Sequence, residues 1–281
     1  MSSRRSFLRN STFGLTAAAL APISAKKDGV FPQKESKPDL LSVGIAGYTF
    51  HHLDIDQSIV IMQQVGVSAL SIKDFHLPLN SSQSTIDEVK RRFNSAGISI
   101  YAAGVIYMRN ETEADQAFSY AKKLGVNLII GSPAYDLLPY AEKKVREENI
   151  RIAIHNHGPE DKLYPGPKDI YDRINKMDSR MGICLDIGHA LRAGADPARS
   201  VSDFSSRIFD LHIKDLADNS SSDKAVPLGR GIIDIPSLVK ALQQIQFKGR
   251  CSIEFEQEVK DPLPGIAEST GFFRGVMSAL S

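Results

Sequence analysis

From residue 40 onward, short apolar runs alternate with stretches in which apolar positions recur every three or four residues. The first pattern is typical of buried strands and the second of amphipathic helices. The predicted strands are Leu41–Thr49, Ala69–Ile72, Ile98–Ala103, Leu128–Gly131, Ile150–His155, Met181–Asp186, Ile208–Ile213 and Cys251–Phe255. Strands that alternate with helical patterns in this way indicate a parallel sheet with crossover helices.

Amphipathic stretches separate these runs, and one more follows the last of them. The predicted helices are Ile55–Val65, Thr85–Ala96, Glu111–Leu124, Leu137–Glu147, Asp169–Met177, Ala198–Ser205, Ile235–Ile245 and Pro264–Leu280. Gly66, Gly97 and Gly125 come directly after three of the helices, where glycine commonly ends a helix. Each of these glycines therefore marks a junction between a helix and the next strand.

Repeated strand–helix units without an internal linker favour an α/β fold, a single-domain (β/α)8 TIM barrel over residues 40–281. A doubly wound open sheet is the alternative, because the order of the strands cannot be read from the sequence. Its dinucleotide-binding version is disfavoured, since no G-x-G-x-x-G motif follows the first strand. In a barrel, the polar residues at the carboxyl ends of the strands meet at one face, where active sites lie.

The first residues have the composition of an export signal. Arg4 and Arg5 precede a mildly apolar stretch that ends in small residues near Ala25. The arginine pair resembles a twin-arginine signal, with an ordinary secretory signal or a disordered N-terminus as alternatives. We predict a twin-arginine-type signal peptide over residues 1–25, a linker over residues 26–39, and a periplasmic or extracellular protein.

The composition of the chain argues against a nucleic-acid partner and against stable insertion in a membrane. The chain has a formal net charge of +1, lacks tryptophan and has no basic run interleaved with aromatic residues, so nothing favours a nucleic-acid partner. The apolar stretch near the N-terminus is too short for stable membrane insertion. Cys184 and Cys251 lie inside apolar runs, and we expect buried, reduced thiols at both positions.

Metal-capable side chains stand at the ends of four consecutive predicted strands. They are His155, His157 and Glu160, then Asp186 and His189, then His212, and finally Glu254 and Glu256. Taken singly, each could be a solvated loop residue or a helix cap. Together they converge on one barrel mouth, which favours a binding site for one divalent metal ion. Mixed carboxylate and imidazole ligands suit Mn, Zn, Fe, Co or Ni better than Ca. The identity of the ion stays open among these metals and Mg.

Four motifs give the chain a resemblance to a known family. They are CLDIGHALRAGADP at 184–197, LHIKD at 211–215, PLGRGIIDIPSLVKAL at 227–242 and SIEFE at 252–256. From about residue 41 onward the chain resembles the xylose-isomerase-like barrel superfamily, which includes sugar phosphate isomerases and epimerases. The resemblance implies that Asp186, His212 and Glu254 bind the metal and that His189 lies beside the substrate.

The fifth strand departs from the family pattern. Many relatives end this strand with a glutamate that binds the metal, whereas this chain has His155-Asn156-His157. We favour Glu160, a little further along the loop, as the fourth ligand and a catalytic group, because a carboxylate preserves the charge and the ligand type. His155 is the alternative fourth ligand. His157 is expected to orient the ligand or to contact the substrate.

Four other polar residues are candidates for contacts with substrate. Lys73, at the end of the second strand, could act as an acid or base, or could simply pair with Asp74. His76, Lys214 and Arg230 are candidate substrate-binding residues. Lys214 could instead pair with the adjacent Asp215, and Arg230 could be a solvated arginine. The aromatic rings of Tyr101 and Tyr107 could stack on a sugar, although core packing also explains Tyr101.

The resemblance implies an enzyme that acts on a carbohydrate. The first hypothesis is a metal-dependent sugar isomerase or epimerase that works through an enediolate, with Glu254 and Glu160 as proton-transfer groups beside Lys73 and His189. The second is a metal-dependent lyase or hydratase acting on 3-keto-glycosides or inososes. The third is a non-catalytic, metal-dependent sugar-binding protein. A small carbohydrate is the expected ligand, and a homodimer is possible.

Overall fold

The computed structural model describes residues 41–281 except 219–223 and 258, and the predicted signal and linker lie outside the described residues. Eight parallel strands form a closed barrel in the order β1-β10-β7-β6-β5-β4-β3-β2. They are β1 (Ser42–Ala46), β2 (Ala69–Ile72), β3 (Ser99–Met108), β4 (Leu128–Pro133), β5 (Arg151–His155), β6 (Met181–Asp186), β7 (Ile208–Ile213) and β10 (Arg250–Ile253). The predicted (β/α)8 barrel is thus confirmed, and the open sheet is excluded.

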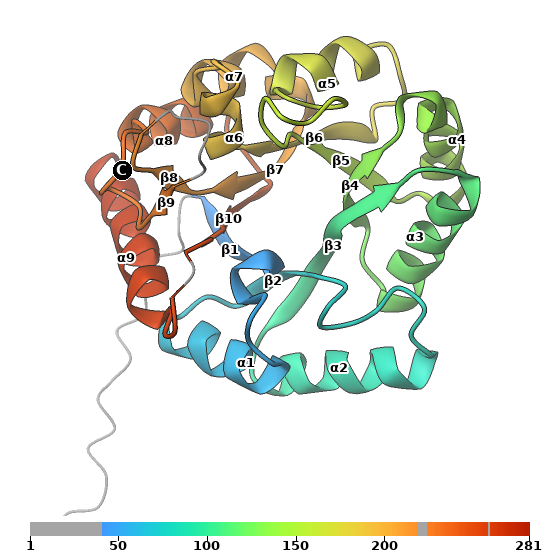
Figure 1. Ribbon diagram of the computed structural model, residues 1–281, viewed down its shortest axis with the longest axis horizontal. Helices are drawn as coiled ribbons and strands as arrows, with labels where there is room; N and C mark the ends of the chain where they lie inside the picture. Colours follow the sequence, from blue (N-terminus) through green and yellow to red (C-terminus); the bar gives the residue numbers. More distant parts are fainter. Residues whose placement is uncertain (1–40, 219–223, 258) are drawn as a thin grey trace, which may run out of the picture. The chain divides into compact units, whose positions relative to one another are not determined.

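Helices surround the strands in a ring, which Figure 1 shows along a direction close to the barrel axis. They are α1 (Ile55–Gln64), α2 (Gln83–Ser95), α3 (Glu111–Leu124), α4 (Leu138–Glu148), α5 (Pro167–Ile174), α6 (Ile187–Arg192), α7 (Pro197–Asp203), α8 (Ile235–Gln244) and α9 (Leu263–Ala279). Short 3₁₀ helices occur at η1 (Gly47–Phe50), η2 (Tyr135–Leu137) and η3 (Ser205–Arg207). No described helix is long and apolar enough to cross a membrane.

Several elements differ from the prediction; β3, for example, continues to Met108 rather than ending at Ala103. Two of the differences have a clear physical reason. The first strand ends at Ala46 rather than Thr49, because the chain turns into η1, where Thr49 bridges to β10. Its hydroxyl donates to the Ile253 carbonyl at 3.1 Å and accepts from the Phe255 amide at 3.0 Å. The short helix α6 was not predicted. Asp186 caps it by accepting from the His189 amide at 2.8 Å.

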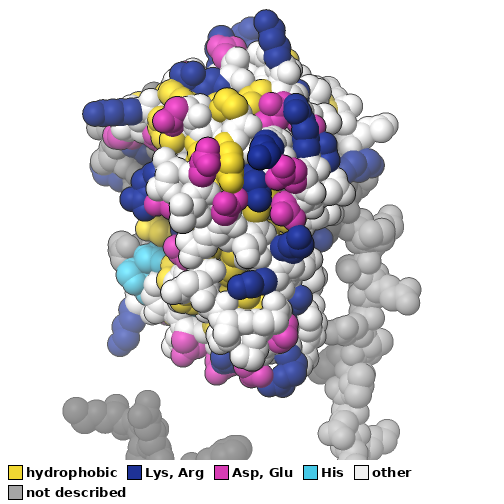
Figure 2. All heavy atoms as spheres, turned by 90° about the vertical axis from the view of Figure 1, so that its right-hand side faces the viewer, with side chains coloured by type: hydrophobic (Ala, Val, Ile, Leu, Met, Phe, Trp, Pro, Cys, Tyr) yellow, Lys and Arg dark blue, Asp and Glu magenta, His cyan; other side chains and the backbone are white. Residues whose placement is uncertain are grey.

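The core has two parts. The larger cluster lies between the strands and the ring of helices. The smaller cluster fills the middle of the barrel and consists of Ala102, Leu128, Ile130, Ala153 and Cys184. Both cysteines are free and buried, as predicted. On the face of the molecule seen in Figure 2, basic and acidic side chains are interspersed, which agrees with the near-zero net charge.

The strand register places alternate residues of each strand inside the barrel. On β5 this inward row is Arg151, Ala153 and His155; on β7 it begins with Asp210 and His212; on β10 it begins with Arg250 and Ser252. Because side chains alternate along a strand, every second residue faces the same way. Each inward row therefore runs from the amino end of the barrel, across the small apolar cluster, to the carboxyl end.

The loop at residues 227–233 is ordered by Asp215, the last residue of the LHIKD motif. Asp215 belongs to the small antiparallel pair β8 (Asp215–Leu216) and β9 (Ala225–Val226). Its fully buried carboxylate accepts hydrogen bonds from the amides of Leu216, Gly229, Gly231 and Ile233 at 2.9–3.1 Å. A side chain at Gly231 would collide with this carboxylate. The glycine-rich run is therefore explained by close approach of the backbone to Asp215.

Asp215→Ala should destabilise the protein by roughly 1–3 kcal/mol, because buried backbone donors lose their acceptor. Urea unfolding of the purified protein measures this change. Asp203→Ala is the matched control, since Asp203 is half exposed and only pairs with Arg199 on the helix surface. The control should change stability by less than about 0.5 kcal/mol. Equal losses in the two variants would contradict the assignment of Asp215.

Candidate functional site

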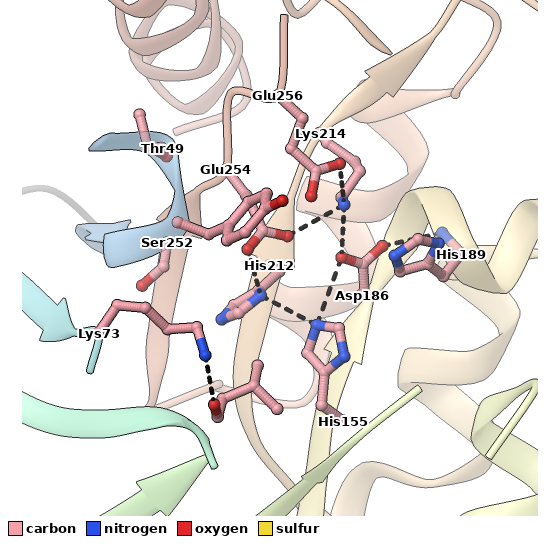
Figure 3. A network of polar contacts seen from close by, with 12 residues as sticks. Thr49, Lys73, His155, Asp186, His189, His212, Lys214, Ser252, Glu254 and Glu256 are labelled. Carbon is pink, nitrogen blue, oxygen red and sulfur yellow. Dashed lines mark hydrogen bonds and ion pairs between the residues drawn. The ribbon is translucent and has the colours of Figure 1, made fainter. Parts of the chain in front are cut away.

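Four side chains from neighbouring strands converge at the carboxyl end of the barrel. They are His155 at the end of β5, Asp186 at the end of β6, His212 on β7 and Glu254 directly after β10. One ligand atom from each lies within 4.8 Å of every other, and all four residues are buried. Figure 3 shows the four side chains pointing toward one another. The barrel strands thus bring two imidazoles and two carboxylates to one point.

The spacing of these atoms suits a divalent ion. His155 Nε2 lies 3.0 Å from His212 Nδ1 and 3.5 Å from Asp186 Oδ2, and His212 Nδ1 lies 3.1 Å from Glu254 Oε1. An ion with ligands at 2.0–2.2 Å separates adjacent ligand atoms by roughly 3–3.5 Å. Nitrogen and carboxylate oxygen together are ligands for zinc and its first-row neighbours. The residues present therefore fit a metal site.

The two histidines of this cluster differ in protonation. Burial, reinforced by His157, holds the pKa of His155 well below its usual value, so this imidazole is neutral. Burial alone would also lower the pKa of His212, but Cys184 and Glu254 raise it well above the usual value. With its raised pKa, His212 carries a proton on Nδ1, which lies 3.0 Å from His155 Nε2 and 3.1 Å from Glu254 Oε1. A metal ion would take the place of this proton.

Lys214 supplies a buried positive charge to the same cluster. Its ammonium lies 3.0 Å from Asp186 Oδ2, 3.0 Å from Glu254 Oε2 and 2.6 Å from Glu256 Oε2, and its side chain is 1% exposed. Burial opposes this charge, but the three carboxylates raise the pKa of Lys214 well above its usual value. Lys214 therefore stays charged and holds the carboxylates in place.

Lys214 does not reach the cavity, contrary to the prediction that it contacts substrate. Its ammonium is enclosed by carboxylates, and the side chain is absent from the cavity wall within the described residues. The alternative pairing with Asp215 is also wrong, because Asp215 accepts hydrogen bonds from loop amides instead. Successive residues of an extended chain point in opposite directions, which separates the side chains of Lys214 and Asp215.

A cavity of about 260 Å³ opens above the cluster. Its wall consists of Ala46, Gly47, Tyr48, Lys73, Gly104, Val105, Tyr107, His155, His157, His189, His212, Glu254 and Glu256. Tyr48 and Tyr107 are 42% and 53% exposed, so their rings remain open to solvent beside the cavity. The cavity thus combines aromatic faces with a concentration of ionisable groups.

Lys73, His157 and His189 line this cavity, as the sequence analysis expected of substrate-contacting groups. Lys73 Nζ donates to the Val105 carbonyl at 2.7 Å and also lies 3.2 Å from Asp74 Oδ1. His157 contacts the Tyr107 hydroxyl at 2.9 Å through Nε2 and Asp161 at 3.1 Å through Nδ1. Burial lowers the pKa of His157, which favours the neutral, basic form.

Three residues predicted for the site lie elsewhere. Glu160 pairs with Arg192 at 2.5 Å, is half exposed, and is not a member of the four-residue cluster. His155 occupies the corner of the cluster that we had assigned to Glu160. His76 Nε2 contacts the Leu53 carbonyl at 2.8 Å, and Arg230 pairs with Glu268 on α9. Neither His76 nor Arg230 belongs to the cavity wall.

Glu256 is a cavity residue whose role the sequence analysis left undefined. Burial raises its pKa to about 7, although Lys214 works against this shift. Its position two residues after Glu254 offered a signal, because alternate residues at a strand end point the same way. Tyr48 was missed for another reason: we placed it in a strand, whereas it belongs to η1 at the rim.

The model of the family described as xylose isomerase-like TIM barrel matches residues 61–276. A search of curated proteins finds no significant match. A solved structure of an uncharacterised protein from Parabacteroides distasonis shares 27% identity, with a TM-score of 0.66 over 84% of this chain and 99% of that one.

Two other similar structures carry functional descriptions. The IOLI protein with a bound zinc atom has a TM-score of 0.72 at 18% identity, covering 85% of this chain and 99% of that one. An E. coli 3-keto-D-glucoside 4-epimerase has a TM-score of 0.66 at 16% identity, covering 84% and 99%. At these identities the likeness concerns the fold. On the match of the family model, the chain belongs to the xylose isomerase-like TIM barrel family.

Proposed function

We propose that the protein is a metal-dependent isomerase or epimerase of a keto-sugar. The observation that carries the proposal is the cluster of His155, Asp186, His212 and Glu254 at the base of a small cavity surrounded by proton-transfer groups. Binding alone needs fewer ionisable groups than this cavity contains, which disfavours a non-catalytic sugar-binding protein.

The cavity suits a substrate of about one sugar ring. Pockets for drug-sized ligands have volumes of roughly 300–1,000 Å³, and this one is slightly smaller, at about 260 Å³. Tyr48 and Tyr107 offer exposed aromatic faces against which the apolar face of a sugar can pack. Lys73 and the histidines supply hydrogen bonds to hydroxyl groups.

The four-residue cluster would hold the metal ion. A bound divalent ion would polarise a sugar carbonyl and stabilise negative charge that develops on its oxygen. His155 binds as a neutral imidazole, while Asp186 and Glu254 contribute charge. Lys214 fixes Asp186 Oδ2, which also faces His155, and Glu254 Oε2. This arrangement leaves the cavity side of the cluster for substrate.

Proton-transfer groups approach the cavity from different walls, as a change of configuration requires. Lys73 follows β2 and His189 follows β6, and these strands are four apart in either direction around the barrel. Glu256 follows β10 and lines the cavity between them. We propose that Glu256 removes the proton next to the carbonyl and that Lys73 or His189, each two strands away from Glu256 around the barrel, returns a proton from a different direction.

A lyase is the second candidate, and the fifth strand favours it. His155 stands where a carboxylate would supply a symmetrical second base, so the two faces of the substrate meet different groups. Lys73, an ammonium at the cavity wall, can protonate a leaving group while Glu256 removes the neighbouring proton. The same residues would then expel an aglycone or water.

Export remains part of the proposal. The twin-arginine pattern at Arg4 and Arg5 favours passage of an already folded protein out of the cytoplasm. Such a route lets the cluster acquire its metal before export. A periplasmic or extracellular enzyme would meet free sugars and glycosides rather than sugar phosphates.

The metal content of two variants should decide whether His155 or Glu160 is the fourth ligand. His155→Ala should lower metal affinity by at least tenfold, because it removes one of four converging donors. Glu160→Gln should leave metal content unchanged, since Glu160 pairs with Arg192. Elemental analysis after dialysis against graded chelator measures both. Metal loss in Glu160→Gln with retention in His155→Ala would reverse the assignment.

Glu256→Gln should lower kcat by a factor of about 10²–10⁴ while metal content stays the same. Glutamine keeps the size of the side chain and can still accept the hydrogen bond from Lys214. Because the carboxylate must be ionised to act as a base, kcat/KM of the wild type should rise with pH through about 7, the pKa of Glu256. In Glu256→Gln, kcat/KM should no longer rise with pH through about 7. An unchanged profile would remove Glu256 from the mechanism.

The reaction class is tested by NMR in D₂O with a panel of ketoses, aldoses and 3-keto-glucosides. Incorporation of deuterium into an isomerised or epimerised sugar supports the primary proposal. Release of an aglycone with an unsaturated keto-sugar supports the lyase. Arg230→Gln serves as a control that should behave like the wild type, because Arg230 pairs with Glu268 outside the cavity. Metal-loaded protein with no turnover on the whole panel would contradict both.

A further inference from the structure

A second cavity, of about 190 Å³, lies at the opposite end of the barrel from the four-residue cluster of His155, Asp186, His212 and Glu254. Its wall consists of Tyr101, Asn127, Leu128, Arg151, Phe209, Asp210, Lys248, Gly249 and Arg250. These residues stand at the amino ends of β3, β4, β5, β7 and β10. The small apolar cluster in the middle of the barrel separates this cavity from the proposed active site.

Three cations face this cavity without an acidic partner. Among the described residues, Arg151, Lys248 and Arg250 form no ion pair within 4 Å; the guanidinium groups instead lie over aromatic rings. Arg151 is 5.3 Å from the ring centre of Phe209, and Arg250 is 5.1 Å from that of Tyr101. Lys248 is exposed, but Arg151 and Arg250 are partly buried, and partly buried cations normally pair with anions. Their concentration around one cavity indicates an anionic ligand.

Asp210 requires that the ligand also donate a hydrogen bond, which an anion without a proton cannot do. It lies beside Arg250 in the strand register, is fully buried, and belongs to the cavity wall. Neither carboxylate oxygen has a hydrogen-bond partner within the described part of the chain. The nearby Tyr101 hydroxyl bonds to Ser252 Oγ at 2.6 Å. A buried carboxylate is stable only when hydrogen-bond donors satisfy its oxygens, so a donor for Asp210 is missing here.

A ligand that satisfies both groups must carry negative charge and also donate a hydrogen bond. We propose that this cavity binds hydrogenphosphate, whose P–O–H group donates to Asp210 while its other oxygens accept from Arg151, Arg250 and Lys248. Arginine matches the geometry of phosphate oxygens through its planar set of donors. The proposal concerns a site separate from the proposed active site and does not depend on the reaction catalysed there.

The proton on the ligand determines selectivity. At pH 8, inorganic phosphate is mainly a dianion that retains one proton, whereas sulfate retains none and phosphate monoesters, with a second pKa of about 6, retain almost none. Sulfate and methyl phosphate would each place an unprotonated oxygen against Asp210. The site should therefore prefer phosphate to either.

The test is isothermal titration calorimetry of the full chain at pH 8 and constant ionic strength, with phosphate, sulfate and methyl phosphate as probes. Phosphate should bind with a stoichiometry of one and a Kd at least tenfold below those of the other two. Thermal unfolding with the same probes gives an independent readout, because a ligand of the folded state raises Tm. Equal affinities for phosphate and sulfate would overturn the role of Asp210.

Variants locate the site. Arg250→Gln and Arg151→Gln should each weaken phosphate binding at least tenfold, whereas Arg91→Gln, which removes an exposed arginine on α2, should leave it unchanged. Asp210→Asn should reverse the selectivity, because an amide donor favours sulfate over hydrogenphosphate. Circular dichroism confirms that each variant is folded. Phosphate binding that persists in both arginine variants would place it elsewhere, including the proposed active site, and overturn the inference.

Discussion

The candidate site depends on one buried ammonium. Lys214 enters the barrel between Asp186, Glu254 and Glu256, and without its charge three carboxylates would face one another in a region closed to water. A buried charge is tolerated when it is paired and hydrogen-bonded, and here each carboxylate offers an oxygen to the same ammonium. The other oxygen of Asp186 accepts from the His189 amide in α6, and the other oxygen of Glu254 faces His212. His155 lies beside the same Asp186 oxygen as Lys214. One lysine thus sets the geometry of the whole cluster.

The periodicity of the sequence was sufficient to predict the barrel, because each strand and helix is a local pattern. Asp186, His212 and Glu254 were among the candidates at the strand ends, and the family resemblance singled them out as metal ligands. The fourth corner was not, because the choice between His155 and Glu160 depends on where a loop folds back. The salt bridge that draws Glu160 to Arg192 joins residues 32 positions apart and has no local signature. Lys214 was assigned to the substrate for the same reason, since its partners come from two other strands.

The side chains that point into the barrel differ in charge between its amino end and its carboxyl end. On β5 and β10 each row begins with an arginine at the amino end and finishes with a cluster residue, His155 or Glu254, at the carboxyl end. Apolar and small residues, among them Ala153 and Cys184, lie between. Among the described residues, the amino-end cavity therefore combines unpaired cations with one buried carboxylate, Asp210, while the imidazole groups and other carboxylates gather around the carboxyl-end cavity. This distribution lets one set of strands present two chemically different cavities, only one of which has the groups for proton transfer.

The central claim is that His155, Asp186, His212 and Glu254 together bind a catalytic metal ion. Anomalous X-ray diffraction from crystals grown with manganese or zinc tests it most directly, because the signal locates the ion without reference to activity. The account predicts a single strong peak within bonding distance of His155 Nε2, His212 Nδ1 and the two carboxylates, beside the cavity that contains Lys73 and Glu256. A peak ligated by Glu160 in place of His155, or the absence of any peak among these four residues, would contradict it.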